Sequence, residues 1–169
     1  MELKRIGVDI MLYVAYGSNM SLEQMAYRCP NSSVIGTGKL HGWKIVFNVH
    51  ADIIETGNMN DELPVVIWDI AKEDWRYLDM YEGYPSYYIK KYVEVEFENG
   101  DFDVAVVYIM ADNRKGICPP GETYFNGIIR GCIDNKIDVE YLYDALEHSY
   151  ENETEYNQYN TRENAYGRF

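Results

Sequence analysis

Residues 12–20 constrain the fold of this chain more than any other stretch. An apolar, aromatic run from Leu12 to Tyr16 stops abruptly at Gly17-Ser18-Asn19. The run predicts a buried strand over residues 12–16. Ser21 and Gln24 then have the spacing of a capping box, which predicts a helix over residues 21–28.

The turn between this strand and this helix is a candidate binding site. Gly17 allows a sharp turn or the close approach of a ligand. Backbone N–H groups at a helix start lack partners within the helix, and they favour a carboxylate or a developing oxyanion. An ordinary strand-turn-helix connection explains the same residues, so the pattern alone leaves both interpretations open.

Length and composition indicate one globular domain with a sizeable core. The chain has 169 residues, of which 47% are hydrophobic and 17 are tyrosines. No run approaches the length of a membrane span, and no signal-peptide pattern begins the sequence, so we expect a soluble, cytoplasmic protein. The formal net charge of -13 disfavours binding to nucleic acid or to an anionic membrane.

The cysteines and histidines do not predict a metal site. Three of each are present, and their spacing does not match that of metal ligands. Reduced thiols in a cytosolic protein explain the cysteines. We therefore expect neither a metal nor another cofactor.

Apolar patterning predicts more strands than helices. Further strands are expected at 34–48 (one or two, with a bend at His41-Gly42), 64–70, 88–97 and 102–110, with loops at 52–62 and 112–120. The turn signal at Asn99-Gly100 predicts an antiparallel hairpin between the last two strands. Further helices are expected at 71–81, at 123–132 with a break at Gly131, and after Asp138, where the apolar stripe is Val139, Leu142, Tyr143, Leu146 and Tyr150. The fold class is α+β, with a small mixed, barrel-like sheet and flanking helices.

The predicted domain spans residues 11–150. Residues 1–10 form an N-terminal extension, and Met11 is an alternative natural start. Residues 151–169 form a polar tail rich in Tyr, Asn and Glu, which we expect to be either disordered or laid over the domain.

Glu82 is the unusual residue of the predicted helix over 71–81. It lies seven residues after Trp75 and four after Leu78, on the same apolar stripe. A carboxylate on a buried face is costly unless it is paired, hydrogen-bonded or functional, and burial raises its pKa toward the range useful for proton transfer. The alternative is a carboxylate at the helix end that is solvated or bonded to a tyrosine.

Three motifs together resemble the γ-glutamylcyclotransferase superfamily. They are Tyr16-Gly17-Ser18-Asn19 after an apolar strand, the run from Leu78 to Pro85 leading to Tyr88, and the run from Tyr124 to Cys132 before the last helix. The resemblance covers about residues 12–150. The turn reads Gly-Ser-Asn, whereas the branch that acts on γ-glutamylamines tends to have Gly-Thr-Leu, so this sequence leans toward the other branch.

The resemblance implies a barrel-like fold and a cavity floored by residues 16–19, with Glu82 as general acid/base. The implied substrate is a small γ-glutamyl compound, which is cyclised to 5-oxoproline with release of an amine or amino acid. Tyr16, Gly17, Ser18, Asn19, Tyr88 and Tyr124 are the implied substrate-binding residues, although each tyrosine could equally be a core ring with a satisfied hydroxyl. A homodimer is one alternative for the oligomeric state.

Three other interpretations compete with this one. The first is a catalytically silent member of the same fold that binds a small ligand or a protein. The second is a cysteine hydrolase that uses Cys29 or Cys132 with a histidine. The third is a structural module without a small-molecule site.

Overall fold

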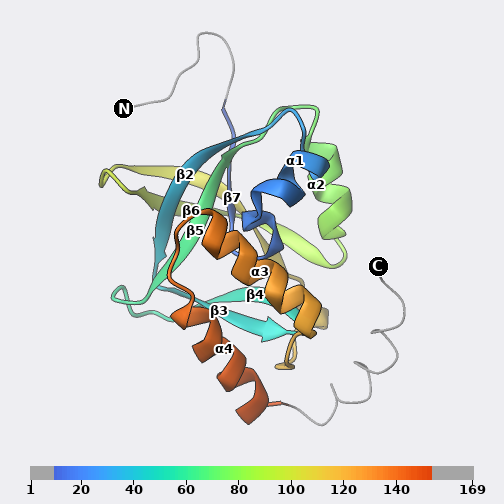
Figure 1. Cartoon of the computed structure of the whole chain (residues 1–169), viewed down its shortest axis with the longest axis vertical. Coiled ribbons are helices and arrows are strands. Elements are labelled where there is room, and N and C mark those ends of the chain that lie inside the picture. The colour runs from blue at the N-terminus through green and yellow to red at the C-terminus, as the bar shows by residue number, and fades with distance from the viewer. Residues whose placement is uncertain (1–9, 154–169) are drawn as a thin grey trace.

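The computed structural model describes residues 10–153 (Figure 1). The predicted N-terminal extension, except for Ile10, and the predicted tail beyond Glu153 lie outside these residues. No described helix is long and apolar enough to cross a membrane.

Five strands form a closed barrel, as the sequence predicts. Its strands are β1 (Leu12–Ala15), β2 (Ser33–His41), β5 (Glu62–Asp69), β6 (Tyr88–Phe97) and β7 (Phe102–Met110). Their order around the barrel is β1-β5-β2-β6-β7. The β1–β7 pair is parallel, and the other neighbours are antiparallel. The parallel pair closes the sheet and places the end of β1, with the turn that follows it, inside the fold.

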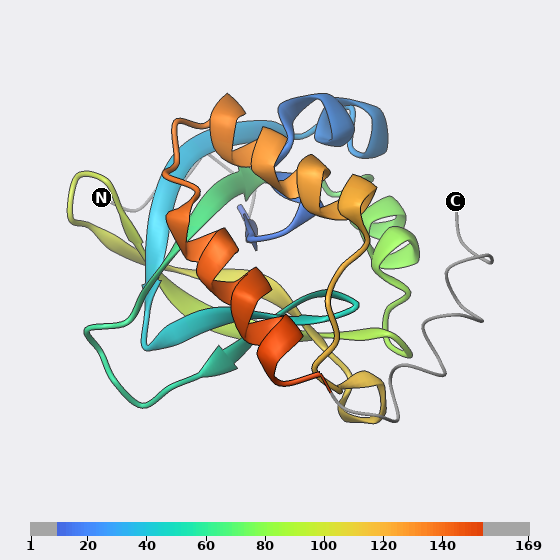
Figure 2. The ribbon, with the colours of Figure 1, turned by 60° about the horizontal axis from the view of Figure 1, so that its bottom comes forward.

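Within the described part of the chain, a separate hairpin and four α-helices surround the barrel. The hairpin consists of β3 (Trp43–Asn48) and β4 (His50–Glu55). The helices are α1 (Leu22–Arg28), α2 (Trp75–Glu82), α3 (Glu122–Asp134) and α4 (Glu140–Glu151), with short 3-10 turns η1 (Ser18–Met20) and η2 (Asp112–Arg114). Helices α1 and α2 lie together at one end of the barrel, α3 packs on η1, and α4 packs on β3 (Figures 1 and 2).

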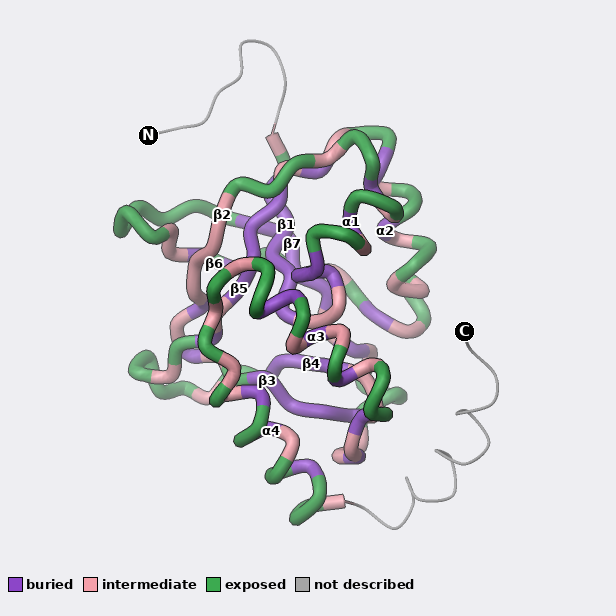
Figure 3. Tube along the Cα trace, viewed as in Figure 1, coloured by how far each residue is buried: buried purple, intermediate pink, exposed green. Residues whose placement is uncertain are grey.

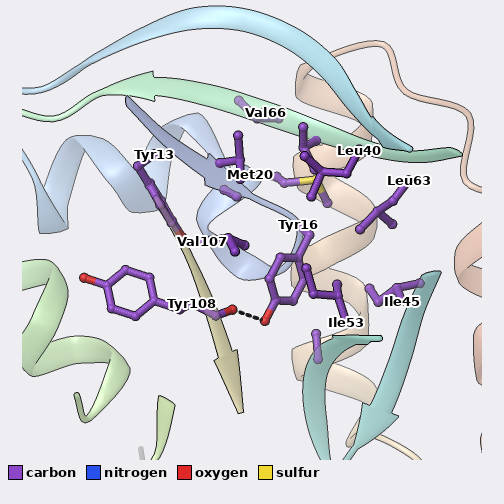
Figure 4. Close-up of a cluster of buried hydrophobic side chains, with 14 of the residues drawn as sticks. Tyr13, Tyr16, Met20, Leu40, Ile45, Ile53, Leu63, Val66, Val107 and Tyr108 are labelled. Carbon is purple, nitrogen blue, oxygen red and sulfur yellow. Dashed lines mark hydrogen bonds between the residues drawn. The ribbon is translucent and has the colours of Figure 1, made fainter. Parts of the chain in front are cut away.

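The core fills the barrel and continues beneath the hairpin and α3. Strands β1 and β7 are largely buried, whereas the outer faces of α1 and α2 are exposed (Figure 3). Aliphatic side chains of the barrel and the hairpin meet around Tyr16 and Met20 (Figure 4). The ring of Tyr16 therefore packs as a core residue, while its hydroxyl donates a hydrogen bond to the backbone oxygen of Tyr108 over 2.6 Å.

Several predicted elements differ in detail from the structure. Residues 50–55 form β4 rather than a loop, because Asp52 is buried and hydrogen-bonded to Asn48 and to the backbone N–H of Met110. Helix α2 begins only at Trp75, because the side chain of Asp74 accepts hydrogen bonds from the segment after α1 instead of capping the helix.

The last two helices also depart from the prediction. Helix α3 runs through Gly131 without a break. In α4 the buried positions are Leu142, Ala145 and Ser149, while Tyr143 and Tyr150 are exposed. The bulk of the two tyrosines suggested an apolar stripe, but the small residues Ala145 and Ser149 are buried in α4, which packs on β3.

Candidate active site

One cavity of about 700 Å³ opens at the end of β1. Residues of β1, η1, α1, α2, β4, β6, β7 and α3 contribute to its wall. Seven of the lining residues are those predicted from the sequence: Tyr16, Gly17, Ser18, Asn19, Glu82, Tyr88 and Tyr124. Segments that are remote in sequence thus meet at one place, and a packed module without a cavity is excluded.

Glu82 is the last residue of α2 and is only partly exposed. Gly83 ends the helix in the left-handed conformation, with φ of 65°, which a glycine adopts without strain. Burial raises the pKa of the Glu82 carboxyl to about 7, and the positive charge of Arg28 opposes that rise. A carboxyl with this pKa can both accept and donate a proton near neutral pH.

Asn19 is the side chain that holds Glu82. Its Nδ2 donates to Glu82 Oε1 over 3.0 Å and to the hydroxyl of Tyr13 over 3.1 Å. The η1 turn that carries Asn19 is closed by a hydrogen bond from Met20 N–H to Gly17 C=O. Glu82 therefore lies at the helix end, as one alternative from the sequence has it, but it bonds to an amide rather than to a tyrosine.

The three predicted tyrosines bond to the backbone, not to Glu82. Tyr88 donates to the carbonyl of Ala51 over 2.7 Å, and the hydroxyl of Tyr124 accepts from the N–H of Ala51 over 3.0 Å. Burial raises the pKa of Tyr16, Tyr88 and Tyr124, so their hydroxyls stay neutral. They are at once core rings and cavity walls.

Helix α3 packs against the η1 turn. A Cβ at Gly131 would lie 2.7 Å from Met20 Cβ and 2.9 Å from Ser21 N. The glycine is therefore required for close packing of α3 on η1, and this need explains a residue that reads as a helix breaker in the sequence. Asn135 Nδ2 adds a hydrogen bond to the carbonyl of Met20 over 2.8 Å.

The predicted capping box forms only in part. Ser21 Oγ accepts from the N–H of Gln24 over 3.3 Å. The N–H of Ser21 donates to the carbonyl of Ser18, so it is not available to the Gln24 side chain. Gln24 lines the cavity instead.

Several cavity residues are not apparent from the sequence. They are Tyr13, Gln24, His50, Met80, Tyr81, Tyr87, Tyr108, Thr123 and Gly127. Most lie on strands and helices whose pairing the sequence does not specify. Tyr13 lies in β1, four residues before Gly17, and this proximity to the Gly-Ser-Asn turn is the one signal that could have included it.

The cysteines lie outside the cavity. None of Cys29, Cys118 and Cys132 lines it. Burial raises the pKa of Cys29 to about 11, which keeps it a thiol, and Cys132 Sγ lies 3.5 Å from the hydroxyl of Tyr141. This arrangement opposes the cysteine-hydrolase interpretation. Within residues 10–153, no cluster of His, Cys, Asp and Glu side chains could hold a metal ion.

Comparison with known proteins supports the family resemblance of the sequence. Residues 13–125 match the family described as "Gamma-glutamyl cyclotransferase, AIG2-like". The gamma-glutamylcyclotransferase of Homo sapiens is 28% identical over 144 residues, which cover 79% of this chain and 76% of the human protein. That of Bos taurus is 28% identical over 151 residues, or 83% of this chain and 79% of the bovine protein.

Solved structures show the same fold. One titled "Gamma-glutamyl cyclotransferase" superimposes with a TM-score of 0.67 at 23% identity, covering 92% of this chain and 99% of that one. YkqA from Bacillus subtilis gives a TM-score of 0.68 at 21% identity, covering 87% of this chain and 56% of that one. With most of its length matched by the family, the chain belongs to the gamma-glutamyl cyclotransferase, AIG2-like family, a family of enzymes.

Proposed function

We propose that this protein cyclises the γ-glutamyl group of a small substrate to 5-oxoproline and releases an amine or amino acid. Glu82 is the general acid/base. The observation that carries the proposal is a carboxyl with a pKa of about 7 that lines the cavity and is held there by Asn19. The family match supports the same reaction class.

The reaction needs one group that moves a proton twice. The α-amino group of the substrate is mostly protonated near pH 7. Glu82 removes a proton from it, and the amine nitrogen attacks the γ-carbonyl carbon to form a five-membered ring. Collapse of the tetrahedral intermediate breaks the bond from that carbon to the leaving nitrogen. Glu82 gives the first proton to this nitrogen and then takes the second proton, which the ring nitrogen must lose to become a neutral amide. That second proton leaves on the released amine, which is protonated near pH 7, so the reaction consumes no other reactant.

The substrate supplies most of the proximity. Nucleophile and electrophile belong to one molecule, and well-oriented intramolecular reactions reach effective molarities of about 10⁵ M or more. The protein has to fold the glutamyl chain and stabilise the oxyanion. Asn19 engages Oε1 of Glu82, so Oε2 is the oxygen that we assign to proton transfer.

The turn and the tyrosines complete the proposed binding site. Backbone N–H groups at Gly17, Ser18 and Asn19 bind either the α-carboxylate or the oxyanion, because the first N–H groups of a helical turn have no partner within it. The rings of Tyr16, Tyr88 and Tyr124 form the wall on which the glutamyl methylene groups pack.

The test is release of 5-oxoproline from a panel of γ-glutamyl dipeptides and γ-glutamylamines. Glu82→Gln keeps the size of the side chain but cannot take the proton, so we expect a loss of about 10²–10⁴-fold in kcat. The matched control is Glu23→Gln, which removes an exposed carboxylate from α1. Equal turnover by wild type and Glu82→Gln would exclude Glu82 as the base.

The second candidate is a catalytically silent member that binds a γ-glutamyl ligand. The partly buried Glu82 and its contact with Asn19 disfavour it, because a cavity for binding alone has no need of a carboxyl with a pKa near 7. Binding without turnover across the whole panel would support it. A cytoplasmic location, and a homodimer as the alternative to a monomer, stay predictions that fractionation and sedimentation can check.

A further inference from the structure

Arg28 lies in the last turn of α1, outside the cavity but in contact with Ser18 and Asn19, which line it. Its Nη1 donates to Asn19 Oδ1 in a short hydrogen bond and to Ser18 Oγ over 3.3 Å. Its guanidinium carbon lies 3.3 Å from the centre of the Tyr81 ring, next to Glu82 on α2. Within residues 10–153, no carboxylate forms an ion pair with Arg28, so its described partners are an amide, a hydroxyl and an aromatic ring.

The contact with Arg28 fixes which way the Asn19 amide faces. A guanidinium only donates hydrogen bonds, so the oxygen of the amide must face it. The nitrogen then faces the other way, and its two protons go to Glu82 Oε1 and the hydroxyl of Tyr13. A rotated amide would place its oxygen against the Glu82 carboxylate, which is repulsive unless that carboxyl carries a proton.

We propose that Arg28 is a positioning residue for the reaction proposed above. It orients the side-chain amide of Asn19 so that the amide donates to Glu82, and it joins α1 to the end of α2 through Tyr81. Arg28 does not line the cavity itself. Its effect on the reaction passes through Asn19 and through its charge.

The electrostatic surroundings of Glu82 make this effect measurable. Other titratable side chains line the same cavity as Glu82. They are His50 of β4 and the tyrosines Tyr13 of β1, Tyr16 just after β1, Tyr81 of α2, Tyr88 of β6, Tyr108 of β7 and Tyr124 of α3. Burial raises the pKa of Tyr13, Tyr16, Tyr88, Tyr108 and Tyr124, so these hydroxyls do not titrate together with Glu82. Asp79, one turn earlier on α2, is paired with Lys90 over 2.7 Å. Arg28 is the cation that lowers the pKa of Glu82.

The experiment is an NMR titration of the Glu82 carboxyl in ¹³C-labelled protein, with the resonance assigned from Glu82→Gln. It needs no substrate, so it tests this inference even if the proposed reaction is wrong. We expect Arg28→Met to raise the midpoint by about one pH unit, at the low end of the effect of a nearby opposite charge. Arg28→Gln keeps a donor without the charge, and Arg28→Lys keeps the charge, so both are expected to shift the midpoint less.

The matched control is Arg76→Met. Arg76 also stacks on a tyrosine of α2, 4.6 Å from the centre of the Tyr77 ring, but it is exposed and outside the cavity. We expect no shift of the Glu82 midpoint in this variant. In kinetics, Arg28→Met is expected to lower kcat/KM about tenfold at pH 5 but only about twofold at pH 8, because one pH unit is a factor of ten in ionised base only well below the pKa.

Two results would overturn the inference. One is an unchanged Glu82 midpoint in folded Arg28→Met and Arg28→Gln. The other is a shift of the same size in Arg76→Met. If Arg28→Met does not fold, Arg28→Gln decides, since it keeps a long polar side chain that can still donate to Asn19 but removes the charge.

Discussion

Asn19 Nδ2 lies 3.0 Å from Glu82 Oε1 and joins two residues that are 63 positions apart in the sequence. This hydrogen bond connects the turn after β1 to the end of α2. It makes one site out of two motifs that the sequence presents separately. The oxygen of the same amide accepts from Arg28, so the contact is part of a chain that begins on α1.

Asn19→Ala is expected to weaken binding of the transition state of a γ-glutamyl substrate, measured from kcat/KM, by about 1.5–3 kcal/mol. This is the usual range for a hydrogen bond to a charged group. Glu82 loses its donor, Arg28 loses its acceptor, and the buried hydroxyl of Tyr13 loses a partner. The check is to compare the steady-state kinetics of wild type, Asn19→Ala and a control, Asn99→Ala, which removes an exposed amide in the β6–β7 turn. Unchanged kinetics in Asn19→Ala would show that Glu82 needs no orientation by Asn19.

Glu82→Gln is expected to stabilise the folded protein at high pH. The carboxyl has a pKa of about 7 when folded and near the usual 4.5 when unfolded, so the folded state holds the proton more tightly. The stability this contributes is complete below pH 4.5 and is lost as the pH rises through 7. At pH 8 the ionised carboxyl therefore costs about 3 kcal/mol relative to low pH.

Urea unfolding of wild type and Glu82→Gln at pH 5 and pH 8 measures this difference. We expect the variant to exceed the wild type clearly at pH 8, and the gap to shrink at pH 5. A gap that is the same at both pH values would mean that the folded-state pKa is not raised. Glu23→Gln, at an exposed position, should show no such pH dependence.

Gly131→Ala is expected to destabilise the protein by about 1–3 kcal/mol, the range for an overpacked contact. The new methyl group would meet Met20 Cβ at 2.7 Å and Ser21 N at 2.9 Å. Because η1 carries Asn19, activity should fall as well.

Gly127→Ala is the matched control on the same helix. A Cβ there meets no atom within 4 Å, so better helix propensity should stabilise the protein by about 0.5–1 kcal/mol. Thermal unfolding of the two variants separates the effects. A stabilised Gly131→Ala would contradict the close packing of α3 on η1.

Asp74→Ala is expected to destabilise the protein by about 1–3 kcal/mol for each buried donor that is left without an acceptor. Asp74 is fully buried, and its carboxylate accepts from Asn31 N–H over 2.9 Å and from Ser32 Oγ over 2.8 Å. These bonds hold the end of α1 against the start of α2. Chemical unfolding measures the loss of stability, with Glu73→Gln, at an exposed neighbouring position, as the control. Equal stability of the two variants would contradict the role of Asp74.

Local patterning was enough to predict the five barrel strands and most of the helices, and to single out the turn after β1 and Glu82 as candidate site residues. Periods of two in β6 and β7 and the Asn99-Gly100 turn are local signals, and the structure confirms the hairpin between them. Glu82 was identified because its position on an apolar stripe breaks the local rule. Such a violation makes Glu82 a candidate functional residue, because a buried carboxylate has to be compensated.

The predictions that were wrong concern residues whose conformation depends on contacts between segments remote in the sequence. Asp52 and Asp74 look like loop and helix-start residues, yet both are buried, since their hydrogen-bond partners come from other elements. Gly131 looks like a helix break, but its missing Cβ makes room for Met20. Local signals do not reveal a partner that lies tens of residues away in the chain.

The sequence by itself determined the strand-turn-helix at residues 12–28, the barrel-like class and the acidic residue at the end of α2. Only the tertiary structure decided that Asn19, rather than a tyrosine, holds Glu82, and that Arg28 stands behind it. The physical reason is that periodicity and capping act over a few residues. The pKa of a carboxyl instead depends on which buried groups and charges the folded chain brings around it.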